Sequence, residues 1–244
     1  MWHAFEPEEH EWYQWNLNGA AAYLRRDGDE WRTAYRPVLF HEIEDGTGGP
    51  EPAPPPEGLP VYVTAGAGRS VALRPYFGDK PSLLKFSGHP HLLPDAEMRI
   101  GLALPPMLQL ELADSLPLIR FMPFLFPETW YGEDTMSGSL YLSLPQEPRE
   151  AAALVRGELL LKNGTKAALD IDRLVLDTEI LGIYEQEGRL ACETVLLEGL
   201  PGEDFRISLL PQTPEGALRL TPGKKPGGTL IRRGVDLIKT IAGK

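Results

Sequence analysis

Short apolar runs separated by prolines dominate the middle of the chain, from Val71 to Pro127. The runs are VALRPYF, SLLKF, HPHLLP, MRIGLALPP, MLQLEL and LPLIRFMPFLFP. Each run is long enough for a β-strand but too short for a typical helix, and the prolines interrupt helices because they lack an amide donor. The pattern therefore predicts a β-sheet core in this region.

Residues 12–40 show a rough alternation of apolar and polar positions on both sides of the sequence Arg26-Asp27-Gly28-Asp29. Aspartate followed by glycine tolerates the positive φ values that tight turns require, so the stretch predicts one hairpin. Four of the five tryptophans lie within the first 31 residues. We interpret them as closing one end of a sandwich core, with a stacking platform for sugars or bases as the alternative.

Changes in composition along the chain predict its domain organisation. Residues 44–60 are acidic and rich in proline, which is typical of an exposed loop. The polar segment between Leu144 and Ala153 predicts a boundary between a larger sandwich domain over 1–145 and a smaller one over 150–222. A single sandwich, in which both blocks contribute strands to shared sheets, stays open. The predicted fold class is all-β, with antiparallel β-sandwiches, two in tandem, and a C-terminal amphipathic helix.

Residues 223–244 predict a flexible linker and a basic amphipathic helix. Thr229 can cap a helix over 230–242, and at about 100° per residue its apolar and polar positions separate completely. The helix either docks on a protein partner or an anionic membrane surface, or packs on the protein's own sheet. The residues that would make the outside contact are Leu230, Ile231, Arg232, Arg233, Val235, Ile238, Lys239 and Ile241.

Charge and cysteine content narrow the function classes. The net charge of −11 would repel a phosphate backbone, so nucleic acid is not expected as a partner. The single cysteine, Cys192, excludes an internal disulfide and a cysteine-built metal site. The acidic N-terminus predicts no signal peptide, and no apolar run is long enough to span a membrane, so we expect a cytoplasmic protein. The oligomeric state stays open.

Two histidines near the centre of the chain suggest a metal site. His89 and His91 are two residues apart, so on a strand they project to one face, and Asp95 and Glu97 follow. The arrangement resembles the first motif of the cupins. It departs from that motif because five residues separate His91 from Glu97, two prolines interrupt the strand, and no histidine follows His91. The alternative is a proline-fixed corner whose imidazoles bond to backbone or water.

Other catalytic signatures do not occur in the sequence. There is no G-x-S-x-G elbow, no glycine-rich phosphate loop and no cofactor motif. We predict that Cys192 is a buried, inert thiol. Asn163-Gly164-Thr165 fits a glycosylation sequon, but a hairpin turn explains it better. The sequence therefore favours a non-enzymatic binding or accessory protein, acting through sheet surfaces and edges or its C-terminal helix. The alternative is a metal-dependent cupin-like enzyme or binding protein centred on His89 and His91.

Three stretches together resemble a known family. They are FGDKPSLLKFSGHPHLLPDAEMRIGLALP, in which Phe77-Gly78 and Leu93-Pro94 are recognisable, KNGTKAALDIDRLVLD and LGIYEQEGRLACETVLL. Their order is similar to that in DUF432, a family of uncharacterised prokaryotic proteins, over roughly residues 12–220. The resemblance implies a β-rich fold and an unknown activity. Its matching positions are packing and turn residues, so it transfers no functional residues.

Overall fold

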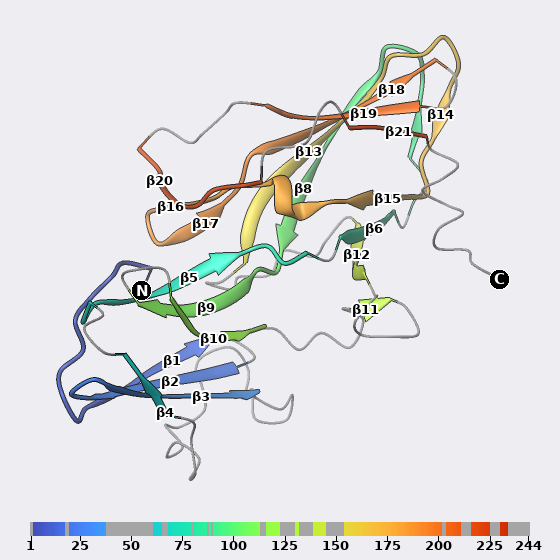
Figure 1. The fold of residues 1–244 in the computed structure, drawn as a ribbon. Coiled ribbons are helices and arrows are strands. Elements are labelled where there is room, and N and C mark those ends of the chain that lie inside the picture. The colour runs from blue at the N-terminus through green and yellow to red at the C-terminus, as the bar shows by residue number, and fades with distance from the viewer. Residues whose placement is uncertain are drawn as a thin grey trace. The chain divides into compact units, whose positions relative to one another are not determined.

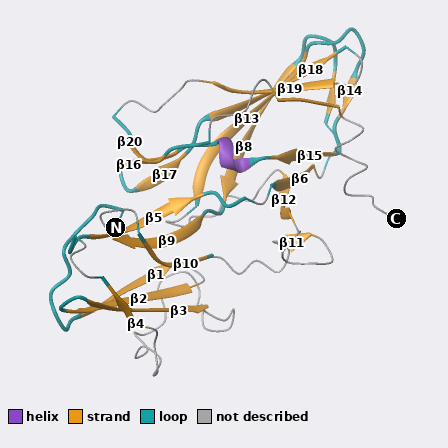
Figure 2. Ribbon diagram, in the orientation of Figure 1, coloured by secondary structure: helices purple, strands orange, loops and turns teal. Residues whose placement is uncertain are grey.

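In the computed structural model, the described part of the chain consists mostly of β-strands (Figures 1 and 2). Within its described part, the one helical element is a 3-10 turn, η2, at Thr178–Ile180. The all-β prediction is confirmed. The structure describes residues 2–17, 20–37, 61–64, 68–79, 81–86, 88, 90–112, 116–122, 130–131, 139–144, 154–201, 204–210, 216–224 and 230–233.

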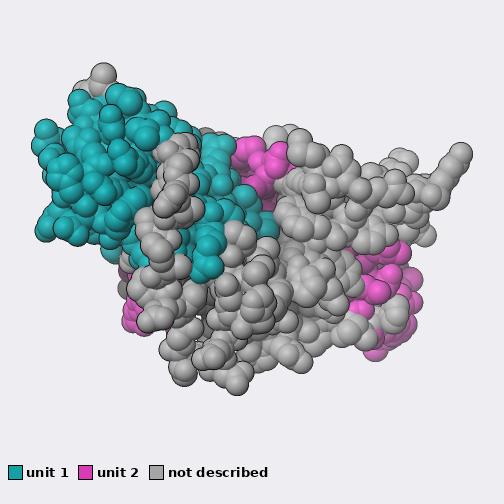
Figure 3. Space-filling view, turned by 90° about the horizontal axis from the view of Figure 1, so that it is seen from below, with its two compact units in different colours: residues 1–76, 105–126, 151–154 teal, residues 77–104, 127–150, 155–244 magenta. Residues whose placement is uncertain are grey.

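The chain divides into two compact units that interleave along the sequence (Figure 3). Unit 1 comprises residues 1–76, 105–126 and 151–154, and unit 2 comprises residues 77–104, 127–150 and 155–244. These are not the sequential blocks 1–145 and 150–222 that the composition suggested. Strands from both blocks share sheets, as the open alternative allowed, because pairing partners are set by long-range packing that local composition does not encode.

The first sheet of unit 1 is antiparallel, in the order β1-β2-β3-β4. Its strands are β1 (Trp12–Leu17), β2 (Ala20–Asp27), β3 (Glu30–Pro37) and β4 (Val61–Val63). The predicted turn lies between β2 and β3, where Gly28 has a φ of 64°. The expected first strand is two strands, because the chain also reverses between Leu17 and Ala20. The Asn-Gly pair at 18–19 is the sequence signal for that reversal.

A second antiparallel sheet in unit 1 has the order β10-β9-β5. Its strands are β5 (Val71–Tyr76), β9 (Met107–Leu112) and β10 (Pro117–Phe121). Phe5 adds a bridge to Val71 on the free side of β5, and its ring contacts Trp15 of β1. Tyr35 of β3 stacks on Phe121 of β10, with ring centroids 5.0 Å apart. The core of unit 1 therefore lies between these two sheets (Figure 1).

The largest sheet in unit 2 is organised around β13 (Val155–Asn163). On one side β13 pairs antiparallel with β8, and on the other it pairs parallel with β17 and then β18. The order is β20-β16-β17-β13-β18-β19-β21. The other strands are β8 (Glu97–Leu104), β16 (Ile183–Gln186), β17 (Arg189–Ala191), β18 (Thr194–Leu200), β19 (Asp204–Leu210), β20 (Leu218–Thr221) and β21 (Leu230–Arg233).

The two faces of this sheet differ in polarity. Leu159 and Leu161 of β13 and Val195 and Leu197 of β18 are buried on one face. The other face carries a row of cross-strand partners with alternating charge, from β8 to β19: Glu97, Lys162, Glu198 and Arg206. Opposite charges on neighbouring strands are favourable pairs, so this row makes a stable solvated surface.

Two smaller sheets complete unit 2. One has the order β11-β12-β6-β15, in which β6 pairs parallel with β12 and antiparallel with β15. The other is the pair β14-β7. Their strands are β6 (Ser82–Phe86), β7 (His91–Leu92), β11 (Trp130–Tyr131), β12 (Ser139–Leu144), β14 (Leu169–Asp170) and β15 (Arg173–Leu176). Leu84 of β6 and Leu176 of β15 are buried in this part of the core.

The predicted C-terminal helix is wrong where the structure describes it. Leu230–Arg233 form strand β21, which pairs antiparallel with β19. The edge of β19 offers these four residues ladder hydrogen bonds, whereas the first turn of a helix leaves its amides unsatisfied. The helix prediction used only the amphipathic periodicity over 230–242, which carries no information about pairing with β19. Residues 234–244 of the predicted helix lie outside the described residues.

The start of the predicted linker is held against unit 2. Lys224 donates its backbone amide to the Glu179 carbonyl at 2.7 Å and its Nζ to Glu179 Oε1 at 2.6 Å. Gly223 crosses so close to η2 that a Cβ there would collide with the Ile180 carbonyl. This crossing brings the chain past η2 before β21.

Candidate functional site

The predicted metal ligands do not converge in the described residues. His91 on β7 bonds through Nδ1 to Asp170 Oδ1 on β14 at 2.6 Å, and both side chains are exposed. Glu97, at the start of β8, lies 3.5 Å from Lys162 Nζ instead. His89 lies outside the described residues. The described part of the chain holds no group of three or more His, Cys, Asp or Glu that could hold a metal, and nothing points to the metal-dependent alternative.

Cys192 lies at an irregularity between β17 and β18. Its amide donates to the Arg156 carbonyl at 2.9 Å, and the register with β13 advances by one residue across Cys192 and Glu193. Burial, and then the charge of Glu193, raise the pKa of the thiol to about 12. The predicted burial of this thiol is confirmed, and at neutral pH the group is a protonated thiol with little nucleophilic character.

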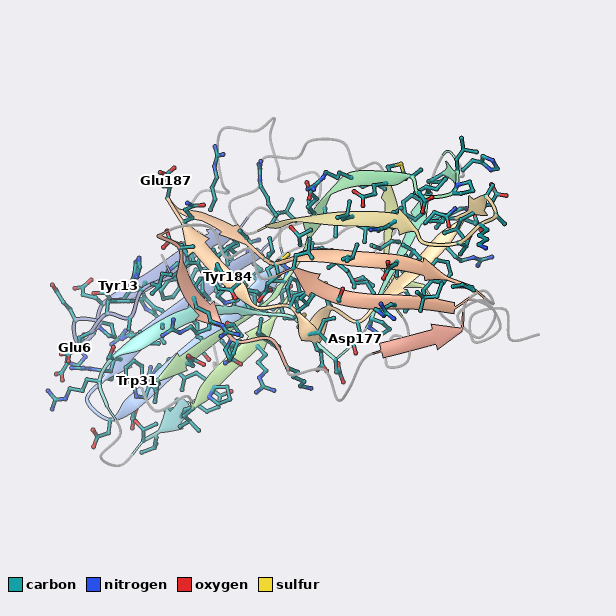
Figure 4. All side chains as sticks on the ribbon, turned by 90° about the horizontal axis from the view of Figure 1, so that it is seen from above. Glu6, Tyr13, Trp31, Asp177, Tyr184 and Glu187 are labelled. Carbon is teal, nitrogen blue, oxygen red and sulfur yellow. The ribbon has the colours of Figure 1, made fainter. Side chains whose placement is uncertain are left out.

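The carboxylate of Glu193 supports the same irregularity. It accepts a hydrogen bond from the Tyr184 hydroxyl and another from the Gly182 amide, each at 2.7 Å. Tyr184 is labelled in Figure 4. Gly157 faces Cys192 so closely that a Cβ at Gly157 would lie 2.5 Å from the sulfur. These contacts are those of a packed β-bulge, and they explain Glu193 without a catalytic role.

Asn163 is buried and holds a turn together. Its Nδ2 donates to the Leu92 and Ala167 carbonyls, and its Oδ1 accepts from the amide and the hydroxyl of Thr165. The side chain is therefore fully occupied and 0% exposed. This arrangement supports the turn interpretation of Asn163-Gly164-Thr165 rather than a glycosylation site.

The tryptophans near the N-terminus mostly pack within unit 1. Trp2 and Trp31 are 2% and 1% exposed, whereas Trp12 and Trp15 are half-buried. The Arg25 guanidinium lies 5.9 Å from the centroid of the Trp12 ring, and the Trp15 ring contacts Phe5. This packing supports the interpretation that the cluster closes the core.

The residues proposed for contact through the C-terminal helix fall into two groups. Leu230, Ile231, Arg232 and Arg233 form β21. Val235, Ile238, Lys239 and Ile241 lie outside the described residues. No membrane-spanning helix occurs in the described part of the chain, where no helix is long and apolar enough.

The edge strand β4 presents the most exposed run of apolar residues in unit 1. Val61, Tyr62 and Val63 are 45%, 38% and 70% exposed. Glu30 pairs with Val63 and Arg32 with Val61, so the two valines share a face with those charged residues, while Tyr62 shares the opposite face with Trp31. Three consecutive exposed apolar residues on an edge strand are unusual in a sheet protein.

The backbone amide and carbonyl groups of Val61 and Val63 point away from β3, as the hydrogen bonding of Thr64 indicates. The Thr64 amide donates to the Asp29 carbonyl at 3.0 Å, which makes Thr64 a hydrogen-bonded partner of β3. Hydrogen-bonded and non-hydrogen-bonded positions alternate along an antiparallel pair, so the backbone amide and carbonyl of Tyr62 also face β3. The amide and carbonyl groups of Val61 and Val63 therefore face away from β3, along what we call the outer edge of β4.

A buried hydrogen bond fixes the end of β4. The indole Nε1 of Trp31 donates to Thr64 Oγ1 at 3.0 Å, and both residues are buried. Trp31 is also the register partner of Tyr62, and it is labelled in Figure 4. The outer edge of β4 is therefore held in an extended conformation before any partner arrives, which reduces the entropy cost of binding.

Three other edge strands carry features that prevent strand pairing, although β1, the opposite edge of the sheet that contains β4, does not. Strand β10 begins with Pro117 and has a register shift in its pairing with β9. Strand β20 also has a register shift in its pairing, and its Arg219 lies over the Tyr184 ring. Strand β8 carries the charged residues Glu97 and Arg99. Strand β4 has no charge, proline or register shift between Val61 and Val63.

The sequence prediction did not identify this edge. Its signal is the short run Val61-Tyr62-Val63-Thr64, which follows Pro60 and precedes the glycine-containing stretch from Ala65 to Gly68. Such a run predicts a short strand. Its position at a sheet edge depends on pairing with β3, which is more than twenty residues earlier and not visible in the local pattern.

A family model described as "Protein of unknown function (DUF432)" matches residues 1–230 of the chain. No curated protein and no solved structure matches the chain.

Proposed function

The chain belongs to the DUF432 family, and we propose that it is a non-enzymatic binding protein that takes up an extended segment of a partner protein along the outer edge of β4. The observation that carries the proposal is the exposure of Val61, Tyr62 and Val63 on a strand that is a sheet edge among the described residues and has no charge, proline or register shift.

Strand addition uses the groups that this edge offers. The outward amide and carbonyl groups of Val61 and Val63 can form ladder hydrogen bonds with a partner strand, and their side chains can form cross-strand pairs. Each such pair contributes about 0.2–1 kcal/mol, so a three-residue edge gives a reversible contact. A transient contact of this kind is appropriate for an accessory protein.

A cytoplasmic location is part of the proposal. The one cysteine of the chain is free and buried. The fold therefore gains nothing from an oxidising compartment, which supports the location.

Fluorescence anisotropy with a labelled synthetic peptide of alternating valine and threonine tests the proposal. We expect the full chain to bind this peptide and not its N-methylated analogue, which cannot form ladder bonds. Val63→Pro removes an outward amide and should abolish binding. Val63→Thr, the matched control, keeps the amide and the β-branched shape and should bind. The proposal is overturned if the peptide does not bind, or if Val63→Pro binds it as well as the native chain.

A further inference from the structure

We infer that the partner segment is basic, with lysine or arginine flanking apolar residues at alternate positions. This inference rests on the proposed function, because it names the chemistry of the segment that pairs with β4. The argument uses the side-chain pattern of the edge, the charge around it, and the area that three residues can bury.

The alternation of side chains sets the apolar part of the segment. Val61 and Val63 lie on one face and Tyr62 on the other. A strand paired with β4 places its own alternate residues beside the two valines. β-Branched apolar residues fit best there, because apolar cross-strand pairs cover the exposed valine side chains.

Charge sets the flanking residues. The chain has a net charge of −11, and residues 42–57 contain five acidic residues and no lysine or arginine. Glu57 is only four residues before Val61, so covalent geometry keeps their Cα atoms within about 14 Å of each other. Negative charge is therefore tethered within about 14 Å of the edge, which is less than two Debye lengths of about 8 Å at physiological salt and well inside the Debye length of about 30 Å at about 10 mM salt.

The described charged residues beside Val61 and Val63 do not oppose a preference for a basic segment. Arg32, the register partner of Val61, lies 3.4 Å from Asp27 Oδ2 and 3.7 Å from Glu30 Oε2. Its charge is already balanced by these carboxylates, so it offers little to an acidic segment. A basic segment gains from the surrounding field, whereas an acidic one is repelled by it.

A second copy of the chain is a poorer occupant. A three-residue strand is about 10 Å long, and such an edge buries far less than the roughly 1,000 Å² that a stable dimer needs. Two copies would also bring two chains of net charge −11 together. Their repulsion weakens as salt is added, which is opposite to the salt effect on a basic segment.

Two labelled peptides separate these alternatives. Both have the same alternating valine core, and one has lysines at its ends where the other has glutamates. We expect the lysine peptide to bind the full chain about tenfold more tightly at about 10 mM salt, with the difference shrinking at about 300 mM salt. Val63→Pro should abolish binding of both peptides.

The outcomes distinguish this inference from the proposed function. Equal affinity for the two peptides, with both lost in Val63→Pro, overturns the basic partner and leaves strand addition standing. Binding of the lysine peptide that survives Val63→Pro overturns strand addition itself, because the attraction is then not at β4. Sedimentation that shows a dimer strengthening with salt, and lost in Val63→Pro, replaces the basic segment with a second copy.

Discussion

The turn around Asn163 in unit 2 and the edge strand β4 in unit 1 differ in how completely their polar groups are used. Asn163 is 0% exposed and makes four side-chain hydrogen bonds. Val63 is 70% exposed, and its backbone groups point away from the neighbouring strand. The first region is complete within the chain, so changes there should alter stability. The second has backbone groups without a ladder partner among the described strands, so changes there should alter recognition.

Asn163→Ala should have the largest effect on stability. It removes two donated and two accepted hydrogen bonds and leaves the Leu92 and Ala167 carbonyls without that donor. Unsatisfied buried groups cost about 1–3 kcal/mol each, so we expect a loss of roughly 3 kcal/mol or more in the free energy of unfolding. Urea unfolding measures it.

Thr165→Ser is the control for this turn. It keeps the hydroxyl that bonds to Asn163 Oδ1 and to the Ala167 carbonyl, so it should cost little. Thr165→Val loses both bonds and should lie between the control and Asn163→Ala. If Asn163→Ala unfolds at the same urea concentration as the native chain, the contrast with β4 is wrong.

Thr64→Val should have the next largest effect, and it tests the anchor of β4. The change removes the oxygen that accepts the Trp31 indole N–H in a buried site. We expect a loss of about 1–3 kcal/mol, because the N–H is left without its partner. Thr64→Ser keeps the hydroxyl and is the matched control. A thermal melt that is identical for both variants would show that the end of β4 is not fixed by this bond.

The sequence predicted turns and strands better than it predicted which strands pair with each other. Asp27-Gly28 marked a turn, and short apolar runs marked strands, because turn chemistry and side-chain alternation are local. The helix prediction was wrong at Leu230–Arg233 because these residues pair with β19, which lies elsewhere in the sequence. The outer edge of β4 was not predicted for the same reason, since exposure of an edge follows from which strands pair.

The pH dependence of stability should reveal a smaller effect at Asp27, which lies in the same sheet as β4. Partial burial opposes ionisation of this carboxyl, but hydrogen bonds from His10 and Arg25 and the charges of Arg25 and Arg32 outweigh it and lower its pKa. The ionised form therefore stabilises the fold above the unfolded pKa of about 3.9, and this contribution disappears as the pH falls through the lower folded pKa.

Asp27→Asn removes that contribution. Urea unfolding of the native chain and the variant should differ at pH 7, and the difference should shrink below about pH 4 as the native carboxyl becomes protonated. A difference that stays constant down to the acid limit would mean that Asp27 acts through packing rather than through its charge.

Val63→Pro should have the smallest effect on stability, although it should abolish peptide binding. The Val63 amide points away from β3, so proline removes no ladder bond, and proline is tolerated at such edge positions. We expect a change within about 0.5 kcal/mol, as for other exposed sites. Tyr62→Pro is the matched control, because the Tyr62 amide faces β3 and its loss breaks the ladder. Tyr62→Pro should cost about 1–3 kcal/mol, because it leaves a carbonyl of β3 without its donor. Equal melting temperatures for the two variants would show that the backbone groups of β4 do not alternate as proposed, and the outer edge would lose its donors.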